Sequence, residues 1–264
     1  MGNSVYMYSM LLDKTNAPLS RLSLHRIQLD QYSSCEIMEI EGDEALLYSL
    51  VGCAQVCVDG LSVGKIGGRR SILDPAVQAV RIPTACAGHL QITLEGYAAD
   101  LLCVTCAPLF PLRNVDPQPP YVHRQDVDIQ LVGQQTYARE VRVLPQPAGY
   151  SIYTGETLSH GGWSSFPAHA TQEDRAHYAD WEELFFVVSN GYGMIHLDGR
   201  YCTGETVNEA RLVHNGDAFP TVLGSHPIVF MPNTWGYYWW GYIGGHVLEK
   251  TYNRWSTDTG VYIR

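Results

Sequence analysis

The histidines of this chain are concentrated toward its C-terminal end, and two of them follow or end glycine-led passages. His169 ends the passage GGWSSFPAH, His226 lies in GDAFPTVLGSHP, and Glu183 precedes the apolar run LFFVV between them. A carboxylate that points inward from an apolar strand needs a partner. Imidazole and carboxylate groups that converge from neighbouring strands bind divalent transition metals such as Zn, Mn or Fe. We therefore interpret His169, Glu183 and His226 as the ligands of one such metal, although each of them alone also fits an ordinary core or surface position.

The elements that must position these residues are short β-strands. Apolar or alternating runs such as ALLYSLVG, AQVCVDG, LQITLEG, GMIHLDG and GYYWWGYIGG recur along the chain and are separated by Gly, Pro, Asp and Asn. Strands of this length with Asp-Gly turns are typical of an all-β sandwich or barrel. Helical periodicity is scarce, and TQEDRAHYADWEEL is the best candidate for a helical turn or an ordered loop.

A weak internal repeat indicates two barrels. Val58-Asp59-Gly60 closes a strand in one half and Leu197-Asp198-Gly199 is expected to do the same in the other, while a Pro-rich passage, APLFPLRNVDPQPPYVHRQ, lies between the halves. Such a polar, Pro-rich passage is typical of a linker. We expect an N-terminal barrel without metal ligands at 1–115, a connecting segment at 116–140 and a C-terminal barrel with the metal site at 141–264.

Composition excludes several partners and locations. Asp and Glu number 27 against 17 Lys and Arg, giving a formal net charge of −10, and the basic residues form no run. Binding to nucleic acid or to an anionic membrane surface requires concentrated positive charge, so we expect neither. We see no apolar stretch of the roughly 20 residues that cross a bilayer and no secretory signal at the N-terminus. The seven cysteines lie mostly in strand-like runs, which favours buried thiols in a reducing, cytoplasmic compartment.

Several motifs of the chain are similar to those of a known family. They are GE at 155–156, GGWSSFPAH at 161–169, EELFF at 182–186 and GDAFPTVLGSHP at 216–227, together with GCAQVCVDG, GGRRSIL and VTCAP in the N-terminal half. On these motifs the chain resembles the 5-deoxy-glucuronate isomerase family, a bicupin group of inositol breakdown. The resemblance implies two tandem cupin-type jelly-roll barrels, with the metal site on His169, Glu183 and His226.

One position departs from the family pattern, which has H-x-H in its first metal motif. Thr171 stands where the second histidine is expected. Three interpretations remain open: His177 or Asp174 completes the site, two histidines and one carboxylate hold the metal with water in the fourth position, or the site has lost its metal. The second arrangement is the facial triad of non-haem iron oxygenases.

The reaction that the resemblance implies is an aldose–ketose isomerisation of a sugar acid. Such a reaction needs a metal to polarise the carbonyl and a base to move a proton between adjacent carbons through an enediol. Glu156 is the expected base, because the matching family segment also carries Glu. Tyr238, or its neighbour Tyr237, is the expected proton donor to a developing alkoxide.

The substrate contacts expected from the sequence are aromatic and basic residues. Trp163 lies in the WSS motif, Trp240 lies in the aromatic run near the C-terminus, and Arg175 lies in the loop beside the metal motif. A sugar-acid carboxylate is usually bound by Arg or Lys, and Arg139 is the alternative to Arg175 for this role. Two other functions stay open, namely a non-haem iron oxygenase and a non-catalytic bicupin that binds a small ligand. We also expect a homodimer, because pairing at barrel edges covers exposed strands.

Overall fold

The computed structural model divides the chain into two compact units. Unit 1 comprises Met1–Val127 and Leu144–Ile152, and unit 2 comprises Asp128–Val143 and Tyr153–Arg264. The structure describes residues 6–30, 34–37, 44–83, 90–94, 98–107, 120–123, 127–147, 150–165, 169–170, 182–200, 206–221, 226–243 and 256–257. In these residues the regular structure consists of strands and one short 3-10 helix, which confirms the predicted all-β architecture. No helix in this part of the chain has the length and apolar character needed to span a membrane.

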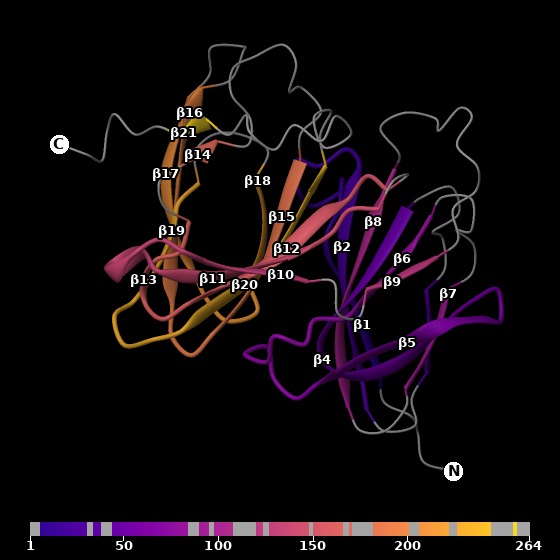
Figure 1. Cartoon of the computed structure of the whole chain (residues 1–264). Coiled ribbons are helices and arrows are strands. Elements are labelled where there is room, and N and C mark those ends of the chain that lie inside the picture. The colour runs from indigo at the N-terminus through magenta and orange to yellow at the C-terminus, as the bar shows by residue number, and fades with distance from the viewer. Residues whose placement is uncertain are drawn as a thin grey trace. The chain divides into compact units, whose positions relative to one another are not determined.

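The described residues of unit 1 form nine antiparallel strands. They are β1 (Tyr6–Leu12), β2 (Leu22–Leu29), β3 (Ser34–Ile37), β4 (Glu44–Val58), β5 (Leu61–Arg69), β6 (Ala79–Ile82), β7 (Leu90–Leu94), β8 (Ala99–Cys106) and β9 (Tyr121–His123). The strands β1-β2-β8-β4-β6-β9 form one sheet in this order. A second sheet contains β3, β7 and β5 together with the second half of β4. The long strand β4 therefore belongs to both sheets (Figure 1).

The change of sheet within β4 occurs at Gly52. This glycine has a φ of +82°, and a Cβ at its position would lie 2.0 Å from the carbonyl oxygen of Ala98. Pairing registers shift on both sides of it, as expected for a β-bulge. The bend closes the sheets around an apolar core to which Leu47, Val56 and Leu101 contribute.

The boundary between the units differs from the one expected from sequence. Residues 128–140, which we expected in the connecting segment, pair within unit 2, whereas 144–152 belong to unit 1. Buried polar groups hold the latter segment in unit 1: the Glu44 carboxylate accepts hydrogen bonds from the backbone N–H groups of Ser151 and Ile152, and Arg81 Nη1 donates to the Ile152 oxygen at 2.6 Å. Unit 2 is therefore assembled from two separate stretches of chain.

The described part of unit 2 is a sandwich of two main sheets. The six-stranded sheet has the order β10 (Asp128–Val132), β11 (Arg139–Leu144), β12 (Tyr153–Ser159), β20 (Gly236–Ile243), β15 (Glu182–Ser189) and β18 (Ala218–Thr221). The four-stranded sheet has the order β13 (Gly162–Trp163), β19 (Ile228–Phe230), β16 (Gly193–Arg200) and β17 (Thr206–Val213). A short pair, β14 (His169–Ala170) with β21 (Ser256–Thr257), lies beside them, and η2 (Gln135–Tyr137) connects β10 to β11. Such double-sheet units are characteristic of jelly rolls.

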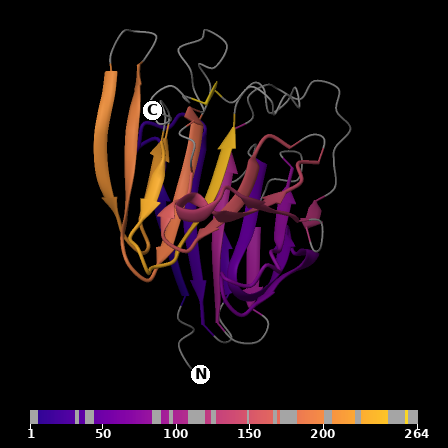
Figure 2. The same ribbon diagram turned by 60° about the vertical axis from the view of Figure 1, so that its left-hand side comes forward.

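Of two turns expected from the sequence, the structure contains one. Asp59-Gly60 forms the predicted hairpin turn with positive φ at both residues, between β4 and β5. Asp198-Gly199, expected to close a strand in the same manner, instead continue β16 and pair with Asn208 and Val207 of β17. This hairpin is the long orange pair of strands in Figure 2. Most of the helix candidate TQEDRAHYADWEEL lies outside the described residues.

Candidate active site

Unit 2 contains a cavity of about 400 Å³ against the inner face of its six-stranded sheet. Strands β10, β11, β12, β15 and β20 each contribute side chains to its wall, and the remaining residues precede or follow the short strands β13 and β19. Valine and aromatic side chains form much of the wall. The polar groups among them include Arg139, Thr157, Glu183, His226 and Tyr238.

Two of the three predicted metal ligands meet in this cavity. Glu183 extends from β15 and His226 precedes β19, and both side chains are buried. The distance between Glu183 Oε2 and His226 Nε2 is 3.3 Å. Two ligands that each lie about 2.1 Å from one ion are separated by about 3.0–3.4 Å when the angle at the ion is between octahedral and tetrahedral. The pair therefore fits neighbouring positions around a divalent transition metal.

The remaining metal-site predictions fall mostly on residues that the structure does not describe. The backbone of His169 pairs with Thr257, but the structure does not describe the His169 side chain. Thr171, Asp174, Arg175 and His177 lie outside the described residues. Among the described residues, no group of three His, Cys, Asp or Glu side chains is arranged to hold a metal. The described donor set is thus one imidazole and one carboxylate.

The two serines of the WSS motif hold the backbone around His226. Ser165 Oγ donates to the His226 carbonyl oxygen at 3.2 Å and accepts a hydrogen bond of 2.8 Å from the Ile228 N–H group. Ser164 bonds to the Ile228 oxygen through both its N–H and its hydroxyl. The motif was visible in the sequence, but its partners are about sixty residues away, so spacing alone gave no indication of this role.

Tyr238 presents its phenol to the cavity, as expected of a proton donor. Its hydroxyl donates a 3.1 Å hydrogen bond to the Ser164 carbonyl oxygen. Burial raises its pKa, and Glu183 adds to this effect, while Ser164, Arg139 and Thr157 partly oppose it. The phenol therefore stays protonated through the neutral range and has a proton to give.

Trp240 forms an aromatic wall with two neighbouring tyrosines. Its ring centroid lies 5.5 Å from that of Tyr153 and 5.9 Å from that of Tyr242, and its Nε1 donates to Thr157 Oγ1 at 3.2 Å. Gly155 makes space for this indole, because a Cβ there would lie 2.5 Å from the ring.

Trp163, also predicted to contact substrate, is partly buried in β13 opposite Val229 and is not among the residues that line the cavity.

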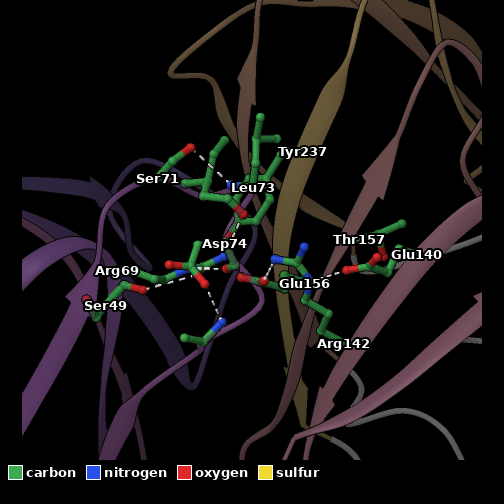
Figure 3. A network of polar contacts seen from close by, with 12 residues as sticks. Ser49, Arg69, Ser71, Leu73, Asp74, Glu140, Arg142, Glu156, Thr157 and Tyr237 are labelled. Carbon is green, nitrogen blue, oxygen red and sulfur yellow. Dashed lines mark hydrogen bonds and ion pairs between the residues drawn. The ribbon is translucent and has the colours of Figure 1, made fainter.

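Glu156, the expected base, faces the other side of the six-stranded sheet. Its carboxylate accepts hydrogen bonds from Arg142 Nη1 at 2.6 Å and from the Tyr237 hydroxyl at 2.8 Å (Figure 3). Burial acts to lower the pKa of Arg142, but Glu156 and Glu140, which also contacts it, outweigh burial and raise the pKa. Strand alternation explains the placement, since Tyr153 and Thr157 of β12 line the cavity and Glu156 lies between them. The structure brings Glu183, His226, Tyr238 and Trp240 together and leaves Glu156 out.

Arg139 lies in the cavity wall, at the start of β11. The sequence identified it only as an alternative to Arg175, because nothing in the local pattern shows which way it points. Burial lowers its pKa, and Tyr238 opposes this change. An arginine nevertheless remains charged in proteins, so Arg139 brings positive charge to the cavity.

Two double-sheet units of the jelly-roll type in one chain form the architecture of a bicupin. The family model of the KduI/IolB family matches residues 4–258, and the chain belongs to this family. The predicted bicupin fold and the predicted family are confirmed.

Individual relatives agree with this assignment. The chain is 28% identical over 134 residues to a 5-deoxy-glucuronate isomerase of Geobacillus kaustophilus, an alignment that covers 49% of this chain and 46% of the relative. A protein of the same name from Geobacillus thermodenitrificans is 26% identical over 144 residues, covering 52% and 50%. The chain thus spans about half the length of the curated relatives it matches.

Solved structures show the same fold. An IolB-like protein from Salmonella typhimurium LT2 superposes with a TM-score of 0.75 at 21% identity, covering 89% of this chain and 88% of the other. An oxalate decarboxylase from Lactobacillus farciminis superposes with a TM-score of 0.57 at 11% identity, covering 92% and 86%. At these identities the likeness concerns the fold alone.

Proposed function

We propose that the protein is an aldose–ketose isomerase that acts on a sugar acid in the cavity of unit 2. The observation that carries the proposal is the convergence of Glu183 and His226 beside the phenol of Tyr238 in one cavity. Family membership supports it, since two relatives of this chain are named 5-deoxy-glucuronate isomerase.

The donor chemistry of the site supports a divalent transition metal held by Glu183, His226 and His169. A bound metal would polarise the substrate carbonyl and its neighbouring hydroxyl. Carboxylate and imidazole ligands suit Zn, Mn or Fe. The 3.3 Å separation of the two described donors is that of neighbouring ligands.

The chain's own residues then orient the substrate and handle protons. When substrate binds, the Tyr238 hydroxyl turns from the Ser164 oxygen and donates its proton in a hydrogen bond to the substrate oxygen on which negative charge develops. Trp240 and Tyr153 provide ring faces for the carbon skeleton. Glu156 is not proposed as the base, because it lies on the opposite face of the sheet.

The direct test measures isomerisation of 5-deoxy-glucuronate by the purified protein, followed by proton NMR, together with metal content by elemental analysis. We expect about one equivalent of transition metal and conversion to the ketose. Glu183→Gln is expected to lose both, whereas Glu209→Gln, on the exposed strand β17, is the matched control and is expected to retain both.

Two results would replace this function with one of the alternatives. Oxygen consumption in the presence of Fe(II) without isomerisation indicates the oxygenase. Saturable binding of a sugar acid with neither activity indicates a binding protein.

The homodimer expected from the sequence stays a prediction. Light scattering coupled to size-exclusion chromatography tests it, and a monomer mass across the concentration range would contradict it.

A further inference from the structure

The loop before Arg139 has a tightly defined backbone. Gly133 has a φ of +81°, and a Cβ there would lie 2.3 Å from the Tyr137 oxygen, so the loop closes on itself around η2. The Tyr137 oxygen in turn accepts a 3.3 Å hydrogen bond from Arg139 Nη1. Gly162 has a φ of +78°, and a Cβ there would lie 2.0 Å from the oxygen of Thr136. These contacts fix the loop that precedes β11, and this loop accepts a hydrogen bond from the Arg139 guanidinium.

Alternation along β11 directs Arg139 into the cavity with two valines. Arg139, Val141 and Val143 line the cavity, whereas Arg142 lies between the valines and joins Glu156 on the other face. Of the described residues that line the cavity, Arg139 is the one lysine or arginine. Its positive charge therefore lies beside apolar side chains, at a site where a ligand can enter.

Positive charge in such surroundings favours an anionic ligand. Partial removal of a cation from water is costly and is offset when an oppositely charged group comes within hydrogen-bonding distance. The planar guanidinium matches a carboxylate, which it binds through two parallel hydrogen bonds. Burial lowers the pKa of Arg139, which is the direction expected for a cation whose surroundings disfavour its charge.

Tyr238 connects Arg139 to the proposed reaction centre. In the strand order of the sheet, β20 with Tyr238 lies between β11 with Arg139 and β15 with Glu183. All three side chains line the same cavity. A ligand whose reacting carbons lie by Glu183 and Tyr238 can therefore extend toward Arg139 with its other end.

We propose that Arg139 binds the substrate carboxylate and makes the cavity select sugar acids over neutral sugars. This inference rests on the proposed function for the orientation of the substrate. It assigns the cavity two ends, one at Glu183 and His226 for the carbonyl and one at Arg139 for the carboxylate. The chemical class it names is a short-chain hydroxy acid with a carbonyl distant from its carboxylate.

The experiment compares the binding of D-glucuronate and D-glucose by isothermal titration calorimetry, without any requirement for turnover. Wild type is expected to bind D-glucuronate at least about tenfold more tightly than D-glucose, since a charge-assisted bidentate contact separates the two. Arg139→Gln is expected to remove this preference and leave glucose binding unchanged. Arg211→Gln, on the exposed strand β17, is the matched control and is expected to behave as wild type.

A third variant keeps the test decisive if Arg139→Gln does not fold. Arg139→Lys retains the charge but not the paired hydrogen bonds, and it is expected to show an intermediate preference. Thermal unfolding of each variant establishes that it is folded.

The outcomes separate this inference from the proposed isomerase. Unchanged glucuronate preference in the folded Arg139 variants, or no preference in wild type, overturns the role of Arg139 and leaves isomerase activity to be judged by its own assay. Loss of preference in Arg139→Gln, in a protein that isomerises no sugar acid, supports the carboxylate contact and overturns the isomerase.

Discussion

Tyr237 donates a 2.8 Å hydrogen bond from its hydroxyl to Glu156, on the face of the six-stranded sheet opposite the cavity. Its neighbour Tyr238 points into the cavity and donates to the Ser164 oxygen. Two adjacent tyrosines on β20 thus have different surroundings. The first belongs to a buried ion-pair network with Arg142, and the second belongs to the proposed reaction centre.

Glu156→Gln tests whether this carboxylate is structural or catalytic. Removing one charge of a buried pair leaves the Arg142 guanidinium with less compensation, so we expect a loss of about 3 kcal/mol in the free energy of unfolding. Urea unfolding followed by fluorescence measures it. An unchanged stability with an abolished kcat would instead show that Glu156 is the base.

The Tyr238→Phe and Tyr237→Phe variants form a matched pair. Loss of the Tyr238 hydroxyl is expected to lower kcat by about 10²–10⁴-fold, the usual contribution of a positioned acid or base. The free energy of unfolding of Tyr238→Phe should fall by only about 1 kcal/mol, because the variant loses one hydrogen bond. Tyr237→Phe is expected to reduce stability and keep kcat within a few-fold. Steady-state kinetics and urea unfolding of both variants measure these effects. Equal kcat values for Tyr238→Phe and Tyr237→Phe would show that Tyr238 has no part in the mechanism.

Ser165→Ala probes the support of His226. The serine hydroxyl bonds to the backbone on both sides of Pro227, and its loss should let the imidazole shift. We expect metal affinity to fall by about 10–100-fold, as for other residues that orient metal ligands. Competition with a chromogenic chelator measures the affinity. Ser159→Ala, whose hydroxyl bonds to the Gly161 oxygen, is the control, and an equal effect in both variants would argue against a specific role.

Acid sensitivity of unit 1 is expected from His25. Burial lowers its pKa, which Asp13 partly opposes, and the Tyr8 hydroxyl lies 2.8 Å from its Nδ1. Since the unfolded chain takes up this proton near the ordinary pKa of about 6.5 and the folded chain only at lower pH, stability falls as the pH drops below about 6.5.

Urea midpoints measured between pH 5 and 8 test this dependence. His25→Gln is expected to flatten the curve in that range, and the exposed His214→Gln is expected to leave it unchanged. A parallel curve for His25→Gln would assign the sensitivity to other groups.

Local sequence patterns were sufficient for several features. Alternating apolar runs predicted the strands, and Asp59-Gly60 predicted a turn because these residue types readily adopt positive φ. The motifs around Glu183 and His226 were sufficient to predict that these two side chains meet. The turn expected at Asp198-Gly199 failed, because pairing with β17 keeps those residues extended.

The face to which each side chain points was decided only by the tertiary structure. All eight residues of β20 are buried, so the usual contrast between an apolar inner face and a polar outer face is absent, and the sequence could not separate Tyr237 from Tyr238. The sequence could not place Glu156 either. Side chains of β12 point alternately to the two faces of the sheet, but almost all of them are buried, so burial does not show which face is the cavity side. The position of Arg139 in the cavity wall and the hydrogen bonds of Ser165 depend on strands and loops far away in the chain. The sequence was sufficient for most of the strands, for the family and for the proximity of Glu183 and His226, whereas the pairing of distant strands placed neighbouring residues on opposite faces of the sheet.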